Sequence, residues 1–346
     1  MAGVKRLIQS DITKILIFLT LTALTAALLS PWLYNAGKMI AEVVESRSAN
    51  TPLLWFAQRC GNADFLQYFH SSLLICGTLL IGPFIMWMQL GQSPKSRNNK
   101  PWTLRLPEPS IAHETGQRLR HNPRGWLHFG TGVLLASSLV LLMMWLLIQT
   151  DWFRLQRPVM WYDAIKSNIT PVVITSVFVE WLLRGVLLGI CLRSMRPGIA
   201  IFIVSLIYAA GHFLSPMAGD QLAQQENWDA GFRMIELIGQ RFFHLGSFAL
   251  PFLTLWCIGM VLSYARFRTA SLWLPIGLHL GWLFVHRVFA EIAVINGEHL
   301  ASADVFISDD RQSGILPISL IIATALLVHV FIQISEERRA TREEKS

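Results

Sequence analysis

Charged and histidine side chains occur inside otherwise apolar segments of this 346-residue chain. Glu180 and Arg184 are four residues apart, so on a helix they share one face and can form an ion pair. His212 lies at the end of a later apolar segment, and His279 lies within another. An ionisable group inside a membrane helix is costly unless it is paired or hydrated, so these residues are candidates for a functional site.

Glu180, His212 and His279 combine one carboxylate with two imidazoles on three different segments. Carboxylate and neutral imidazole groups bind zinc in proteins, and a catalytic zinc keeps one position open for water. The same three groups can also orient a water molecule. The sequence therefore predicts a site that holds a divalent metal, such as zinc, or a water. His286 follows His279 by two helical turns on the same face and is a further candidate ligand.

Each of these residues also has a structural interpretation. An ion pair between Glu180 and Arg184 can simply fix the register of a helix, and a single histidine in a helix bundle is usually a hydrogen-bonded core residue. Arg287 and Glu291 are also four residues apart, toward the end of their segment, and we expect them to form an interfacial pair. The functional interpretation depends on three helices bringing their polar groups to one place.

Eight apolar segments position these residues. A helix of about 20 apolar residues crosses the hydrocarbon core of a bilayer. The predicted spans cover residues 14–35, 65–90, 126–149, 168–194, 198–214, 242–265, 271–294 and 314–335. Residues 37–63 and 150–167 mix charges with aromatic side chains and are expected to lie flat at the interface. The predicted fold is all-α, a polytopic membrane helical bundle with about eight transmembrane helices.

The composition supports a membrane protein. Hydrophobic residues make up 53% of the chain and charged residues only 15%, whereas soluble domains carry about 25% charged residues. A net charge of +7 would suggest nucleic acid as the partner of a soluble protein. Here the basic residues are expected in loops, where they set the membrane topology, so no nucleic-acid partner is predicted. The four cysteines form no CxxC pair and are interpreted as packing residues.

The distribution of Lys and Arg predicts the orientation. With the N-terminus in the cytoplasm, about twice as many of them fall inside as outside. This bias supports an integral protein of the inner membrane with both termini cytoplasmic. Residues 1–164 are expected to form N-terminal spans with a basic loop. Residues 165–295 are expected to form the functional core, and residues 296–346 the last span and a charged tail.

Three motifs in this core resemble those of the CPBP family of intramembrane proteases, which includes type II CAAX prenyl endopeptidases. The sequence E-x-x-x-R-G from Glu180 matches the second half of the family's Glu-Glu-x-x-x-Arg motif. Tyr208-x-x-x-His212 fits the second motif, an aromatic residue followed by x-x-x-His. The third motif, His-x-x-x-Asn, is matched at His279, and the stretch RTASLW from Arg268 is similar to its usual entry. The resemblance covers about residues 165–295.

The resemblance implies an endopeptidase that acts on membrane-associated peptides or lipidated C-termini within the bilayer. It implies that a motif-one glutamate activates water, that the histidines orient this water, and that the Asn of motif three stabilises the oxyanion. Carried over to this chain, the catalytic candidates are Glu180, Arg184, His212 and His279. Whether a bound metal takes part stays open.

The chain departs from the family pattern at two positions. Val179 replaces the first glutamate, the usual base, and Leu283 replaces the Asn. Loss of a general base typically costs about 10²–10⁴-fold, and loss of an oxyanion donor about 10²–10³-fold. Glu180 can substitute for the base only if its side chain faces the water, although one residue along a helix is a rotation of about 100°. His286 is the other residue that can compensate.

Two further functions therefore stay open beside the peptidase. One is a non-catalytic pseudo-protease that binds or scaffolds membrane clients. The other is a transporter in which the same polar groups line a pathway. The transporter is less favoured, because the sequence has no evident internal repeat of the kind that many transporters have.

Overall fold

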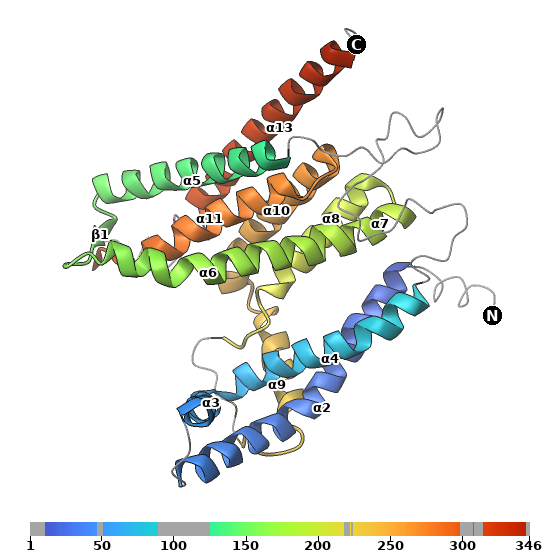
Figure 1. Cartoon of the computed structure of the whole chain (residues 1–346), viewed down its shortest axis with the longest axis vertical. Helices are drawn as coiled ribbons and strands as arrows, with labels where there is room; N and C mark the ends of the chain where they lie inside the picture. Colours follow the sequence, from blue (N-terminus) through green and yellow to red (C-terminus); the bar gives the residue numbers. More distant parts are fainter. Residues whose placement is uncertain are drawn as a thin grey trace. The chain divides into compact units, whose positions relative to one another are not determined.

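The computed structural model describes residues 11–46, 51–88, 125–217, 222, 224–297, 307 and 314–343. These residues divide into two compact units. Unit 1 contains the described parts of Met1–Ser93 and His212–Phe248, and unit 2 contains those of Pro94–Gly211 and Ala249–Ser346. Helices dominate both units, which confirms the predicted all-α fold (Figure 1). The basic loop predicted between the second and third spans lies outside the described residues.

Unit 2 carries Glu180 and His279. Its helices are α5 (Gly125–Gln149), α6 (Trp161–Glu180), the π-helix η1 (Trp181–Leu187), α7 (Leu188–Ser194), α8 (Pro197–Gly211), α10 (Leu245–Thr269, from Ala249 onward), α11 (Trp273–Ile292) and α13 (Ile315–Glu343). The helix α11 packs against both α5 and α6, and the three run side by side in Figure 1. The short strands β1 (Phe153–Leu155) and β2 (Ala293–Ile295) pair antiparallel and join the segments that follow α5 and α11.

Glycines bring α5 and α11 into close contact. A Cβ atom at Gly281 would lie 2.8 Å from a backbone carbonyl oxygen of α5, and one at Gly132 would lie 2.8 Å from a carbonyl oxygen of α11. Gly277, one turn before Gly281, also contacts the α5 backbone. Small residues at such spacing allow membrane helices to approach closely. His279 lies two residues from each of these α11 glycines, about 200° around the helix, and therefore faces away from α5.

Unit 1 is built around α2 (Asp11–Glu45), which packs against α3 (Thr51–Asn62), α4 (Phe65–Trp87) and α9 (Ala230–Arg241). Phe65 and Phe69 of α4 pack with Met234 and Ile238 of α9 in one apolar cluster. The side chain of Asp64 caps α4 by accepting a hydrogen bond from the backbone N–H of Gln67 at 2.8 Å. This cap fixes the sharp turn between α3 and α4.

Among the described residues, six helices are long and apolar enough to cross a membrane. They cover Ile12–Val44, Phe65–Trp87, Gly125–Gln149, Trp161–Leu192, Phe248–Thr269 and Ile315–Ser335. The other two predicted spans are also helices: α8 is apolar but has 15 residues, and α11 has 20 residues but carries several polar side chains. The chain is therefore an integral multi-pass membrane protein, and eight is an approximate count of its spans.

Several helices extend beyond the predicted spans. A span predicted from hydropathy ends where the sequence becomes polar, whereas the backbone hydrogen bonds of a helix can continue through polar residues. The first predicted span, residues 14–35, lies within the longer α2, which runs on to Glu45. Of the two segments expected at the interface, residues 37–63 contain the end of α2 and the amphipathic α3, and their place at the interface stays a prediction. Residues 150–167 instead contain β1 and the first turns of α6. All four cysteines are free thiols, of which Cys76 and Cys191 are buried and Cys60 and Cys257 are half-buried.

Candidate functional site

Glu180, Arg184 and His279 form one buried network in unit 2. The Nη1 atom of Arg184 donates to Oε1 of Glu180 at 3.0 Å, and both side chains are 0% exposed. The Nδ1 atom of His279 lies 2.8 Å from the same oxygen. Because a carboxylate oxygen only accepts hydrogen bonds, His279 donates from Nδ1. The three charged or polar groups therefore all meet at Oε1.

The second carboxylate oxygen of Glu180 has a different environment. Within the described residues, Oε2 is buried without a hydrogen-bond partner, and so are Nε of Arg184 and the hydroxyl of Ser176. Ser176 lies one turn before Glu180 on the same face of α6. Buried polar atoms in proteins nearly always have a partner, either in the protein or in ordered water. The arrangement thus leaves a buried acceptor and a buried donor available to a water molecule or a ligand.

A π-helix holds the cationic member of the network. The segment η1 begins directly after Glu180, and at its end the N–H of Leu188 donates to the carbonyl oxygen of Leu183, five residues earlier. Short π-helical segments inside α-helices are frequent at functional sites. Arg184 lies in this segment, and its Nη2 donates to the carbonyl oxygen of Gly259 at 3.3 Å. The guanidinium therefore connects the α6–η1 rod to α10.

Tyr208 of α8 covers the guanidinium. A Cβ atom at Gly259 would lie 2.9 Å from the Cβ of Ser205, so α8 and α10 cross closely at this point. One turn after Ser205, the Tyr208 ring lies over Arg184, with 4.4 Å between its centroid and the guanidinium carbon. The same ring meets His279 edge to face, with centroids 6.1 Å apart. Tyr208 thus contacts both partners of Glu180 and adds a cation–π interaction.

The structure brings some of the predicted site residues together and leaves others apart from them. Glu180, Arg184 and His279 lie together, whereas their catalytic roles stay predictions. His212 is exposed and is the first residue after α8, in unit 1, so its part in the site also stays a prediction. His286 is half-buried on α11, two turns beyond His279, and its predicted role is likewise untested.

The positions that depart from the family pattern lie next to the network. Val179 is half-buried, whereas Glu180 is fully buried and faces His279. The carboxylate that reaches the histidine therefore comes from position 180 and not from position 179. Leu283 lies one turn after His279 on α11 and is half-buried, so an apolar side chain follows the imidazole on its own face.

The arrangement does not resemble a metal site. Among the described residues, no three His, Cys, Asp or Glu side chains lie close enough together to hold a metal ion. Glu180 and His279 are hydrogen-bonded to each other, and a guanidinium shares the same carboxylate oxygen. A cation in this position opposes the binding of a second cation. The residues as arranged do not fit zinc, and the expected metal stays a prediction.

Three further residues contribute to this region. Tyr208 was recognised only as the aromatic residue of the second motif, and Gly259 contributes a backbone carbonyl that no sequence pattern signals. Arg266 directly follows the predicted span at residues 242–265, yet it is 1% exposed, and its Nε donates to the carbonyl oxygen of Arg184 at 3.4 Å. The helix α10 continues past the predicted end to Thr269, which keeps Arg266 in the bundle.

The second charged pair on α11 also differs from expectation. Glu291, which was expected to pair with Arg287, accepts hydrogen bonds from Asn168 at 2.8 Å and from Ser167 at 3.2 Å. Both donors belong to α6. The carboxylate therefore joins α11 to α6 more than three turns after His279, outside the buried network.

Comparison with known proteins identifies the segment that carries this network. Residues 164–285 match the family model of the type II CAAX prenyl endopeptidase Rce1-like proteins. No curated protein and no solved structure shows significant similarity to the chain. The matched range includes Glu180, Arg184, Tyr208 and His279, and it agrees with the range of the resemblance seen in the sequence. Residues 164–285 are therefore a domain of the type II CAAX prenyl endopeptidase Rce1-like family.

Proposed function

We propose that the domain at residues 164–285 is an intramembrane endopeptidase in which Glu180 activates a water molecule. The observation that carries this proposal is the asymmetry of the Glu180 carboxylate. Oε1 accepts from Arg184 and His279, while Oε2 is buried without a partner among the described residues. An acceptor oriented in this way, in a site shielded from bulk water, suits a general base.

The proposed reaction uses Glu180 twice. A water molecule donates a hydrogen bond to Oε2, and its proton moves to Glu180 as the water oxygen bonds to the carbonyl carbon of the peptide. The carbonyl oxygen then carries the negative charge of the tetrahedral intermediate. Glu180 next returns the proton to the amide nitrogen as the C–N bond breaks, which regenerates the carboxylate and releases an amine and an acid.

The neighbouring residues have supporting roles in this proposal. Arg184 compensates the buried charge of Glu180 and, with His279, holds Oε1 so that Oε2 points to the water. We assign His212 as a further imidazole that orients the water or the peptide. Leu283 supplies no hydrogen bond, so we expect a rate about 10²–10³-fold below that of a site with an oxyanion donor at this position.

One observation favours a second function, the binding of membrane peptides without cleavage. Glu180 and Arg184 are 0% exposed, and Val179 and Leu283 are both apolar. A carboxylate that remains closed off from a peptide would serve only to stabilise the bundle. The domain would then present or sequester a membrane client.

A cleavage assay separates the two functions. The purified chain, reconstituted in lipid nanodiscs, is incubated with a library of membrane-associated peptides, half of them with a prenylated C-terminal cysteine, and the products are identified by mass spectrometry. We expect cleavage that is lost in Glu180→Gln and in His212→Ala. Peptide binding without any cleavage by the unaltered chain would support the non-catalytic function, and full activity of both variants would exclude the proposed mechanism.

The proposal includes the topology. We place both termini in the cytoplasm and the protein in the inner membrane, with α8 and α11 crossing in addition to the six apolar helices. The 20 residues of α11 extend about 30 Å, enough to cross the hydrocarbon core, and its buried His279 bonds to Glu180 at the end of α6. Topology reporters fused to the N-terminus and to the C-terminus should both show a cytoplasmic location. Termini on opposite sides would require an odd number of crossings.

A further inference from the structure

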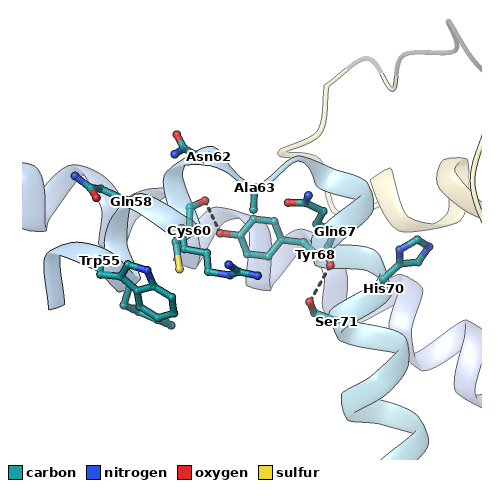
Figure 2. A pocket seen from close by; sticks show the side chains of 11 residues that line it. Trp55, Gln58, Cys60, Asn62, Ala63, Gln67, Tyr68, His70 and Ser71 are labelled. Carbon is teal, nitrogen blue, oxygen red and sulfur yellow. Dashed lines mark hydrogen bonds between the residues drawn. The ribbon is translucent and has the colours of Figure 1, made fainter. Parts of the chain in front are cut away.

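A pocket of about 790 Å³ lies in unit 1, where α3 meets the first two turns of α4 (Figure 2). Trp55 and Gln58 of α3 line it from one side, and Gln67, Tyr68 and His70 of α4 line it from the other. Its volume is in the range of pockets that hold small organic ligands and far exceeds that of a single inorganic anion. None of these residues belongs to the Rce1-like domain.

The chemistry of the lining favours an anion. None of the described residues that line the pocket is acidic, whereas Arg59 lines it together with the side-chain amides of Gln58, Asn62 and Gln67. Arg59 is exposed, and its guanidinium carbon lies 5.8 Å from the ring centroid of Trp55. Among the described residues, no carboxylate lies within ion-pair distance of this guanidinium. A planar guanidinium with several amide donors nearby is suited to recognise a phosphate group.

The walls of the pocket are held in place by hydrogen bonds. The Nζ atom of Lys38 donates to the carbonyl oxygens of Gly61 and Ala63, at 2.5 and 2.9 Å, at the turn between α3 and α4. The hydroxyl of Tyr68 donates to the carbonyl oxygen of Cys60 at 2.9 Å, an interaction drawn in Figure 2. The turn therefore carries the cation of Lys38 as well as the Asp64 carboxylate that caps α4. These hydrogen bonds preform the pocket, and Arg59 supplies the cation in its lining.

The surroundings of the pocket favour an amphiphile over a soluble anion. The helix α4 is one of the candidate membrane spans, and the pocket lies at its beginning. The exposed face of α4 that starts at Ser71 continues through Ile75 to Leu79, which is 71% exposed. Trp55 at the mouth is 61% exposed, as is typical of aromatic residues at the membrane interface. A polar head in the pocket would place its apolar chains directly along α4.

We propose that this pocket binds the headgroup of an anionic phospholipid. The phosphate contacts Arg59 and the neighbouring amides, the glycerol portion fills the remaining volume beside Tyr68, and the acyl chains lie along the apolar face of α4. This site is independent of the proposed peptidase activity.

Native mass spectrometry of the full chain in detergent micelles tests the proposal. Three probes are titrated separately: phosphatidylglycerol, phosphatidylcholine with the same acyl chains, and inorganic phosphate. We expect preferential binding of phosphatidylglycerol, and Arg59→Gln should weaken it about tenfold, because a charge-assisted hydrogen bond is lost. Gln67→Leu should weaken it to a smaller extent. The matched control is Lys166→Gln, which removes an exposed cation from above the Tyr162 ring in unit 2.

The outcomes are distinguishable. Selective loss of phosphatidylglycerol in Arg59→Gln and Gln67→Leu, with normal binding in Lys166→Gln, supports the site. Equal binding of the two lipids, or unchanged binding in Arg59→Gln, overturns it. If inorganic phosphate alone binds as tightly as phosphatidylglycerol and its binding is weakened in Arg59→Gln, the pocket recognises a free anion and the lipid assignment is wrong. Peptidase activity is not part of any readout, so failure of one proposal leaves the other intact.

Discussion

The Nδ1 atom of His279 lies 2.8 Å from Oε1 of Glu180, although 99 residues separate the two in the sequence. The contact joins α11 to the end of α6, and Arg184 shares the same oxygen from the following π-helical turn. The proposed chemistry depends on the two oxygens of this buried carboxylate. Oε1 accepts two hydrogen bonds, whereas Oε2 has no partner among the described residues.

Replacing Glu180 by Gln should reduce peptide hydrolysis by about 10²–10⁴-fold, because an amide cannot take a proton from water. The amide oxygen can still accept from Arg184 and His279, so the fold should persist. Initial rates of the purified variant in nanodiscs provide the measurement. Glu291→Gln is the matched control, since it changes a carboxylate on α11 that bonds to α6 outside the network and should hydrolyse at the unaltered rate. Equal loss in both variants would contradict a specific role for Glu180.

The ion pair should respond non-additively to substitution. Arg184→Leu leaves the carboxylate of Glu180 buried without its cation and should destabilise the protein by about 3–5 kcal/mol. The double variant Glu180→Leu with Arg184→Leu removes both charges and should recover most of this loss. Denaturant unfolding in detergent, followed by tryptophan fluorescence, measures the difference. Additive effects of the two single substitutions would mean that the charges do not interact.

The close approach of α5 and α11 should be sensitive to a single methyl group. In Gly281→Ala the new Cβ would lie 2.8 Å from a carbonyl oxygen of α5, and overpacking of this kind costs about 1–3 kcal/mol. The variant should unfold at lower temperature and lose activity, because α11 also carries His279. Gly130→Ala on α5 is the control, as its Cβ would meet nothing within 4 Å. It should be as stable as the unaltered protein or slightly more so. Equal thermal stability of the two variants would rule out the proposed contact.

Leu283→Asn should increase the hydrolysis rate. The new amide would lie one turn after His279 on the same face and would supply a hydrogen-bond donor at the position to which the proposed mechanism assigns oxyanion stabilisation. A gain of about 10²-fold or more is expected from such a donor. Leu283→Gln, which places its amide one methylene further from the backbone, serves as the geometric control and should gain less. A rate that stays at the unaltered level in Leu283→Asn would show that the missing donor does not limit this protein.

Chelation should leave the reaction unaffected. Arg184 and His279 both bond to Oε1 of Glu180, and no three ligating side chains converge to hold a divalent cation in the part of the chain that the structure describes. Dialysis against a strong chelator, followed by elemental analysis and the peptide assay, checks this expectation. Activity that disappears on chelation and returns with zinc would instead support the ligand set of Glu180, His212 and His279 expected from the sequence.

The sequence by itself determined the features that depend on local periodicity. Apolar runs of about 20 residues predicted the eight helical segments, since a bilayer and a helix of fixed rise dictate that length. The spacing of four between Glu180 and Arg184 predicted their ion pair, since residues four apart are neighbours on any helix. The order of the three motifs predicted the family, which the match of residues 164–285 confirms.

Only the tertiary structure decided which groups from different helices meet. The His279–Glu180 contact and the Tyr208–Arg184 stack depend on how α11, α8 and α6 pack. That packing is governed by close backbone approaches at glycines far apart in the chain. Arg266 is buried for the same reason, although its position in the sequence resembles a loop. Helix periodicity specifies a face, but the partner of that face is specified by long-range contacts, which no local pattern encodes.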